Sequence, residues 1–271
     1  MVKISKNGTA YQFIGGADRP CIVLIHGLGL TQHMWQWHKD ILGRDYSLLL
    51  YDLYGHGDSK PAPQPPSLSL FSEQLYHLLQ DINSPKYALV GFSLGGMINR
   101  RFFLDYRDRL NMAQKLSAIA IFNSPHERAP DLQREVVARA KQVANDGASA
   151  TMDAAIQRWF TKNFITNNPD IIALVRQWRK QVDTASYAGA CRVLAEGVEE
   201  LIRPPKAITT PCLIMTCEND SGSTPFMAKE MQKEMPNSEI MIVPILQHMG
   251  LVEQPHLFCN PLLDFFKRIH F

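Results

Sequence analysis

The stretch GFSLG, residues 91–95, places Ser93 between two glycines directly after an apolar run. A serine hydroxyl becomes a nucleophile toward an acyl carbonyl when a neighbouring base removes its proton. The spacing G-x-S-x-G between a strand and a helix makes a tight turn, in which small neighbours let the serine adopt a strained conformation with its oxygen exposed. The pattern therefore predicts a nucleophile at Ser93. The alternative is a glycine-rich turn whose serine caps the following helix.

The loop HGLG at residues 26–29 follows another apolar run and offers a second part of the same chemistry. A tetrahedral intermediate carries an oxyanion, which needs two N–H donors that converge on it. The N–H of Leu94 can be one donor, because Leu94 follows Ser93 at the start of the helix. The N–H of Leu28 can be the other, since the glycines around it would let this loop approach closely. The alternative is an ordinary loop after a strand.

A base must take the proton from Ser93, and His248 has the most suitable position. It lies in ILQHMGLVEQP, residues 245–255, between the last predicted strand and the last predicted helix. The carboxyl ends of parallel strands meet at one edge of a sheet, so Ser93 and His248 are expected at the same edge. His56 lies in a glycine loop, where a structural hydrogen bond is favoured over catalysis. The other histidines are His26, His33, His38, His77, His126, His256 and His270.

A carboxylate must hold the imidazole in one tautomer, and Asp220 is the favoured candidate. It ends the run PCLIMTCEND, just past a predicted strand. Asp52 lies almost within its strand and Asp58 lies in the glycine loop, while Glu218 stays open on position alone. Along the chain the nucleophile, acid and base would then follow in the order Ser93, Asp220, His248, which is the order of one specific fold.

Apolar runs that alternate with helical patterns would position these residues. Strands are predicted at 21–27, 46–55, 87–93, 116–124, 211–217 and 238–244, and the first thirteen residues alternate like a further strand. Helices are predicted at 69–82, 97–110, 225–235 and from 261 to 271. This alternation predicts an α/β fold with a mostly parallel sheet and helices on both faces.

Residues 126–205 interrupt the alternation, because they contain no convincing strand. Four helices are predicted there, at 131–147, 151–164, 169–182 and 186–201. We expect a core domain of residues 1–125 and 206–271, with a helical lid at 126–205 inserted over the sheet. Of the two adjacent aromatic residues in this lid, Trp159 is expected to face the nucleophile and Phe160 to pack inside. Four arginines make the lid locally basic, which could suit a substrate that carries a carboxylate. We expect them instead on a solvated helix surface: Arg158, Arg176, Arg179 and Arg192.

The composition is that of an ordinary globular protein of 271 residues, with 45% hydrophobic residues and a net charge of +2. No clustered basic face suggests nucleic acid, and no apolar run approaches the length of a membrane span. The first residues lack the apolar core of a signal peptide. The five cysteines are odd in number and lie mostly in apolar runs, so we expect buried reduced thiols in a cytoplasmic protein. No CxxC pair suggests a metal.

Taken together, HGLG, YDLYGHGDS, GFSLGG, CEND and QHMGLVEQP resemble the α/β-hydrolase superfamily along nearly the whole chain. The resemblance implies the α/β-hydrolase fold and favours Asp220 over Glu218, and Asn123 stands where some members carry the acid instead. Serine at position 93 argues against haloalkane dehalogenases and epoxide hydrolases, which use aspartate. Residues 152–164 and 186–194 resemble the cap of 3-oxoadipate enol-lactonases. The sequence differs from the family pattern in two places: CENDSGSTP has an extra residue, and residues 111–116 lengthen the segment before the strand predicted at 116–124. Neither difference removes a catalytic candidate.

The sequence thus predicts a serine hydrolase that transfers an acyl group to water through Ser93, His248 and Asp220, with no metal or organic cofactor. The expected substrate is a small-molecule ester or lactone, and the expected assembly is a monomer or homodimer. Three alternatives remain at this stage: a C–C bond hydrolase of ring-fission products, a cofactor-free perhydrolase or haloperoxidase, and a receptor for a small ligand.

Overall fold

A twisted sheet runs through the computed structural model, which describes residues 1–109, 112 and 115–271. The described residues form eight strands in the order β1-β2-β4-β3-β5-β6-β7-β8. The first two run antiparallel to their neighbours, and the others are parallel. The strands are β1 (Lys3–Ile4), β2 (Ala10–Ile14), β3 (Cys21–Ile25), β4 (Ser47–Tyr51), β5 (Tyr87–Phe92), β6 (Leu116–Phe122), β7 (Cys212–Cys217) and β8 (Ser238–Val243).

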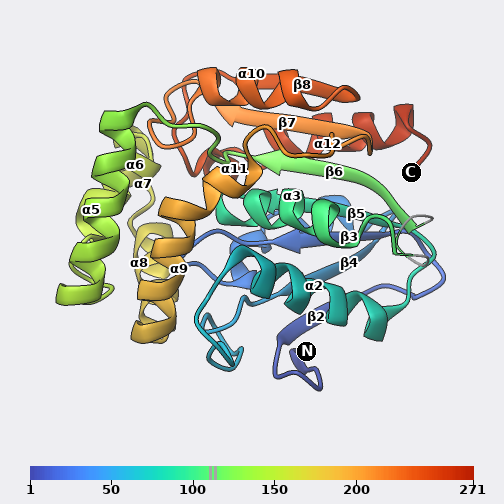
Figure 1. Cartoon of the computed structure of the whole chain (residues 1–271), viewed down its shortest axis with the longest axis horizontal. Helices are drawn as coiled ribbons and strands as arrows, with labels where there is room; N and C mark the ends of the chain where they lie inside the picture. The colour runs from blue at the N-terminus through green and yellow to red at the C-terminus, as the bar shows by residue number, and fades with distance from the viewer. Residues whose placement is uncertain (110–111, 113–114) are drawn as a thin grey trace.

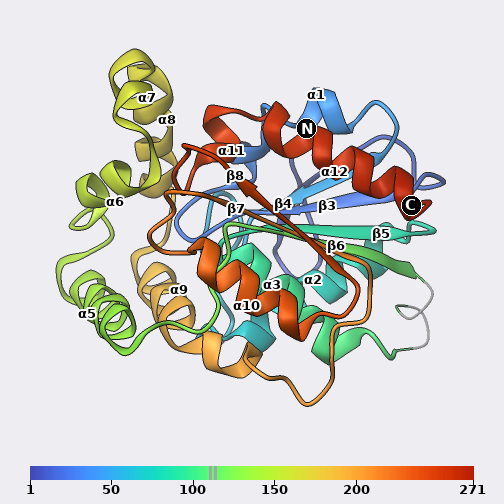
Figure 2. The same cartoon turned by 90° about the horizontal axis from the view of Figure 1, so that it is seen from above.

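The central strands are apolar at nearly every position because both faces of the sheet are covered. Alternate residues of β3 enter different cores: Val23 packs on one side of the sheet and Leu24 on the other. Helices α2 (Leu68–Ile82), α3 (Leu94–Tyr106) and α10 (Pro225–Glu234) cover the first side. Helices α1 (Lys39–Leu42), α11 (Gly250–Glu253) and α12 (His256–Arg268) cover the other (Figure 2). The predicted α/β-hydrolase fold is therefore confirmed.

Several predicted elements differ in extent from those observed: the strand predicted at 46–55 ends at Tyr51, the helix predicted at 97–110 begins at Leu94, and two further differences have a clear structural reason. The alternating N-terminal segment forms two strands, since a turn at Gly8, with φ of +84°, folds β1 back onto β2. Helix α12 begins at His256, five residues before the predicted start, and contains Pro261 within its first turns. The last residue of the predicted helix 97–110, and part of the lengthened segment at 111–116, lie outside the described residues.

Residues 126–205, here called the helical insert, lie beyond the carboxyl ends of β6 and β7 (Figure 1). All of them are described, and they form five α-helices and a 3-10 helix rather than four helices. Phe160 leaves the second predicted helix in an extended conformation, and Thr161 then caps a new helix through its hydroxyl. The helices are α5 (Pro130–Asp146), α6 (Met152–Trp159), α7 (Lys162–Asn167), α8 (Pro169–Lys180), α9 (Thr184–Glu196) and η2 (Gly197–Leu201). The division into core and lid domains stays a prediction.

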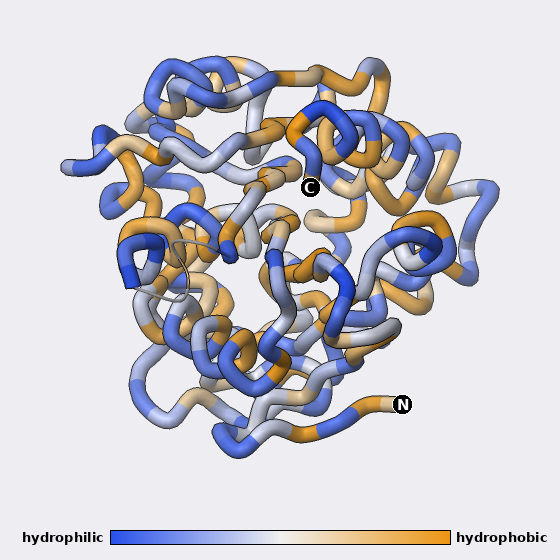
Figure 3. Tube along the Cα trace, turned by 90° about the vertical axis from the view of Figure 1, so that its right-hand side faces the viewer, coloured by the Kyte–Doolittle hydropathy of each residue, from blue (hydrophilic) through white to orange (hydrophobic). Residues whose placement is uncertain are grey.

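The helices are amphipathic, and hydrophobic and hydrophilic residues alternate within single turns of the trace (Figure 3). Within the described part of the chain, no helix combines the length and the apolar character that crossing a bilayer requires. All five cysteines are buried and unpaired, as predicted. Burial raises the pKa of the Cys212 and Cys217 thiols to about 12.

Candidate active site

Ser93 occupies a strained turn between β5 and α3. Its φ of 54° and ψ of −113° lie outside the regions that a residue with a side chain prefers. The neighbouring glycines make the turn sterically feasible: a Cβ on Gly95 would lie 2.4 Å from the carbonyl oxygen of Ile25. The N–H of Ser93 donates to the carbonyl of Phe122 at 2.9 Å, which ties the turn to β6. The turn therefore holds the serine hydroxyl at the edge of the sheet, beside the first turn of α3.

The HGLG loop lies against this turn, and two buried histidines shape it. A Cβ on Gly27 would lie 3.2 Å from the Cβ of Ser93. His56 accepts a hydrogen bond from the N–H of Gly29 at 3.1 Å, so the structural role predicted for it is confirmed. His26 accepts from the N–H of Leu53 at 2.9 Å. Burial lowers the pKa of His26 to about 4 and that of His56 to about 3, which keeps both rings neutral.

The backbone N–H groups of Leu28 and Leu94 remain available at this junction. Among the described residues, neither donates a hydrogen bond to a protein acceptor. Leu94 is the first residue of α3, where the helix leaves its N–H groups without intrahelical partners. Both residues lie next to the Ser93 turn, and Leu28 also lines the cavity described below. The two predicted oxyanion donors are thus placed near the same hydroxyl.

Asp220 and His248 meet across the loops that follow β7 and β8. The Nδ1 of His248 lies 2.7 Å from Oδ2 of Asp220, and the carboxylate side chain is almost fully buried. Asp220 also accepts hydrogen bonds from the N–H groups of Gly222 and Ser223, each at 2.9 Å. These donors fix the carboxylate in place, so the imidazole keeps its proton on Nδ1 and leaves Nε2 free to act as a base.

Asn123 completes the surroundings of this carboxylate, and sequence reasoning assigned it no part in the site. Its amide donates to Oδ2 of Asp220 at 2.9 Å from the end of β6. The competing carboxylates lie elsewhere. Glu218 accepts from the N–H of Ile245 at 2.8 Å on the surface. Asp52 is bound by the backbone and side chain of Gln32, and Asp58 is exposed.

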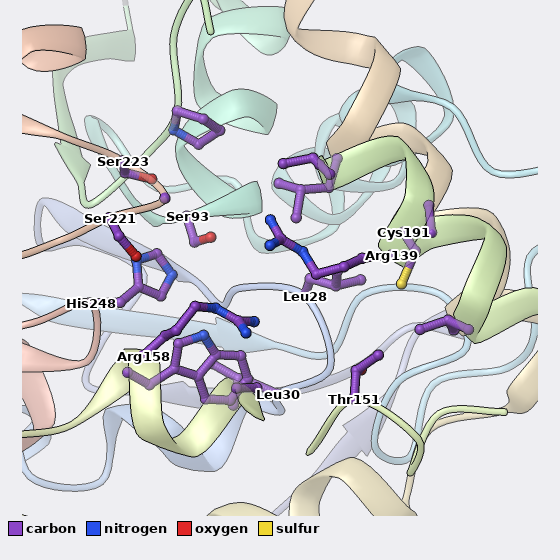
Figure 4. Close-up of a pocket in the computed structure, with 18 of the residues that line it drawn as sticks. Leu28, Leu30, Ser93, Arg139, Thr151, Arg158, Cys191, Ser221, Ser223 and His248 are labelled. Carbon is purple, nitrogen blue, oxygen red and sulfur yellow. The ribbon is translucent and has the colours of Figure 1, made fainter. Parts of the chain in front are cut away.

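Ser93, Asp220 and His248 line one cavity of about 140 Å³ beneath the helical insert (Figure 4). The His248 ring lies near the rings of Phe92 and Trp159, with centroids 4.9 and 6.3 Å away. Trp159 lines the cavity, and its contact with a substrate stays a prediction. Phe160 is fully buried and stacks on Phe164 with centroids 5.3 Å apart. Trp159 therefore faces the cavity, whereas Phe160 packs in the interior.

The helical insert is bonded directly to the segment that carries His248, and the sequence offered no signal of this contact. The N–H of Met249 donates to the carbonyl of Trp159 at 2.8 Å. The carboxylate of Glu253 accepts from the N–H and the hydroxyl of Thr161, at 2.8 and 2.7 Å. Burial raises the pKa of this carboxyl above its usual range. These bonds fix Trp159 relative to the histidine.

The arginines of the helical insert separate into two groups. Arg158 and Arg179 line the cavity, whereas Arg176 pairs with Asp153 at 2.6 Å outside it, and Arg192 is exposed. The expected solvated surface is therefore wrong for Arg158 and Arg179, because α6 and α8 turn these residues toward Ser93. Two further arginines, Arg128 and Arg139, also line the cavity and were not among the sequence candidates.

Comparison with known families decides the classification. A model described as "Alpha/beta hydrolase family" matches residues 22–260. The chain belongs to the alpha/beta hydrolase family. It is accordingly a hydrolase, and the match covers the sheet from β3 to β8, the helical insert and the loops that carry Ser93, Asp220 and His248.

Individual relatives of this hydrolase cover nearly the whole chain. The chain is 25% identical over 261 residues to 3-oxoadipate enol-lactonase 2 of Acinetobacter baylyi, covering 96% of this chain and 93% of the relative. It is 26% identical over 253 residues to a pimeloyl-[acyl-carrier protein] methyl ester esterase of Vibrio vulnificus, covering 91% and 94%. The solved enol-lactonase of Burkholderia xenovorans LB400 superposes with a TM-score of 0.83 at 23% identity, covering 96% and 98%, and shares its fold.

Proposed function

We propose that this chain is a serine hydrolase that cleaves a carboxylic ester or lactone of a small molecule. Ser93 is the nucleophile, His248 the general base and acid, and Asp220 the carboxylate that orients the imidazole. One observation carries the proposal: three residues from distant loops line a single cavity, with His248 already bonded to Asp220 at 2.7 Å. This is the arrangement that nucleophilic acyl transfer requires.

The proposed reaction has two halves. His248 removes the proton of Ser93 as the oxygen attacks the carbonyl carbon, and the N–H groups of Leu28 and Leu94 stabilise the oxyanion. The imidazolium then protonates the departing alkoxide, which leaves an acyl-enzyme on Ser93. His248 next activates water to hydrolyse this acyl-enzyme, and Asp220 stabilises the imidazolium in both halves.

The substrate class rests on the cavity and on the relatives. The cavity of about 140 Å³ has room for only a small ligand, and its lining is more apolar than polar. Two relatives named above act on a lactone and on a methyl ester, by their names. Lactones and esters present the same carbonyl to an attacking serine, so one triad can serve both.

Hydrolysis of p-nitrophenyl acetate tests this function. The wild-type protein should release p-nitrophenol well above the buffer rate, and Ser93→Ala should fall to near that rate. Ser221→Ala is the matched control, because Ser221 also lines the cavity but lies outside the strained turn. It should keep most of the activity. Equal turnover in Ser93→Ala and wild type would contradict the proposal.

A further inference from the structure

The cavity beside Ser93 contains more positive than negative charge. Its lining includes one carboxylate, Asp220, which is already bonded to His248. It also includes four arginines, all from the helical insert: Arg128, Arg139, Arg158 and Arg179. Arginine keeps its charge at any ordinary pH, so these side chains need partners of opposite charge or a structural role.

Two of the four have structural roles. Arg128 donates to the carbonyls of Leu194 and Ala195, at 3.0 and 3.2 Å, which ties the start of the insert to α9. The guanidinium of Arg179 lies over the rings of Trp159 and Tyr187, 5.6 and 4.4 Å from their centroids. Both side chains therefore hold elements of the insert together, and their presence in the cavity needs no ligand.

Arg139 and Arg158 have no such role. Neither forms a hydrogen bond or an ion pair with another residue in the described part of the chain, although both are partly buried. Figure 4 shows their guanidinium groups, one from α5 and one from α6, directed into the space in front of Ser93 and His248. Arginines on the outside of the same segment behave differently: Arg134 pairs with Asp131 and Arg176 with Asp153.

The two free guanidinium groups also repel neighbouring charges. Burial, and then the charge of Arg139, lower the pKa of Arg158. The same two causes, in the same order, lower the pKa of Arg128 to about 10. An anion bound in front of Arg139 and Arg158 would offset this repulsion and form charge-assisted hydrogen bonds. The geometry and the charge balance thus both favour a negatively charged ligand at this position.

We infer that Arg139 and Arg158 form a subsite for a carboxylate that the substrate carries in addition to its scissile ester or lactone. A carboxylate matches the planar fork of an arginine. The subsite is built from side chains in the interior and at the end of their helices, not from helix N-termini of the kind that bind phosphate. The assignment of the scissile bond rests on the proposed function, whereas the anion subsite does not.

Matched substrate pairs test the subsite. Monomethyl glutarate carries a carboxylate on the acyl part of the ester, where methyl glutaramate carries an amide. Acetoxyacetate and acetoxyacetamide differ in the same way on the alkoxy part. In the wild type, kcat/KM for the carboxylate should exceed that for its amide by about 10- to 100-fold in at least one pair. Arg139→Gln and Arg158→Gln should each reduce this ratio toward unity. Arg134→Gln, on the outer face of α5, should leave it unchanged.

A binding measurement separates this inference from the proposed function. Calorimetric titration of the wild type and of Ser93→Ala with glutarate should give binding that Arg139→Gln and Arg158→Gln abolish and Arg134→Gln retains. Such binding without hydrolysis of any ester would refute the proposed function and support the subsite. Ester hydrolysis with equal rates for carboxylate and amide in both pairs, and no glutarate binding, would overturn the subsite. Tighter binding of inorganic phosphate than of glutarate would overturn its assignment to a carboxylate.

Discussion

Truncation of Trp159 distinguishes a side chain that faces the cavity from one that holds the helical insert together. Trp159 is half-buried, and its ring faces His248 and the guanidinium of Arg179. Phe160 next to it is fully buried and stacked on Phe164. Trp159→Ala and Phe160→Ala therefore form a matched pair of aromatic truncations on adjacent residues, with opposite expected consequences.

The magnitudes follow from burial. Phe160→Ala should cost about 3–5 kcal/mol of unfolding free energy, as for other buried aromatic residues. In a chain of this size each kcal/mol lowers the melting temperature by about 2–4 °C, so a fall of roughly 6–20 °C is expected. Trp159 is only partly buried, where its ring packs against the edge of the core and over Arg179, so Trp159→Ala should cost about half as much, about 1.5–2.5 kcal/mol. Its melting temperature should fall by only about 3–10 °C.

The effect on substrate preference should be the reverse, larger for Trp159→Ala than for Phe160→Ala. Removal of the Trp159 ring enlarges the cavity beside His248, so the ratio of kcat/KM for long and short acyl esters should change by about 10-fold or more. Thermal denaturation and kcat/KM for esters of graded acyl length check both effects on the same preparations. A large fall in melting temperature with unchanged chain-length preference would place Trp159 in the packed interior of the insert and refute this reasoning.

Three further predictions follow from the same contacts. Asp220→Asn should lower kcat by about 10⁴-fold with little change in KM, whereas Glu218→Gln should retain activity; full activity of Asp220→Asn would assign the acid elsewhere. Thr161→Val removes the hydroxyl that both donates to Glu253 and caps α7, about 2 kcal/mol together, and should lower the melting temperature by about 4–8 °C; an unchanged value would show that these two contacts add no stability. The lowered pKa of His56 means that only the unfolded chain binds a proton there between pH 6.5 and about 3, so stability falls as pH falls through this window. Between pH 7 and pH 5 this effect amounts to about 2 kcal/mol of unfolding free energy, so His56→Gln should reduce the loss of stability measured by urea unfolding at these two values by about that amount, and an unchanged loss would contradict the cause.

Local sequence pattern was sufficient for the elements that build the sheet. The runs that became β3, β5, β6 and β7 are short and apolar because both of their faces are covered. The loop residues after these strands could be placed at one edge, because parallel strands end together. The same argument predicted that Ser93, Asp220 and His248 would lie near one another.

The helical insert could not be read in the same way. Its helices have no common edge, so spacing alone did not reveal which side chains face the cavity. Arg139 lies within a charged helix and resembles a surface residue, yet the packing of α5 against α9 directs it into the cavity that Ser93 also lines. The break at Phe160 was also missed, because it depends on contacts from Glu253, far away in the sequence. The sequence showed that Asn123 is a polar residue after a predicted strand. Its hydrogen bond to Asp220 could be identified only once the fold was known.

Mass spectrometry after treatment with a fluorophosphonate tests the central claim most directly. Such a probe reacts covalently only with a serine whose hydroxyl is activated by a base. The intact protein should gain one adduct, peptide mapping should place it on Ser93, and Ser221→Ala should be modified in the same way. Ser93→Ala should gain no adduct. An adduct that persists in Ser93→Ala, or that maps to another residue in the wild type, would contradict the assignment of Ser93 as the nucleophile.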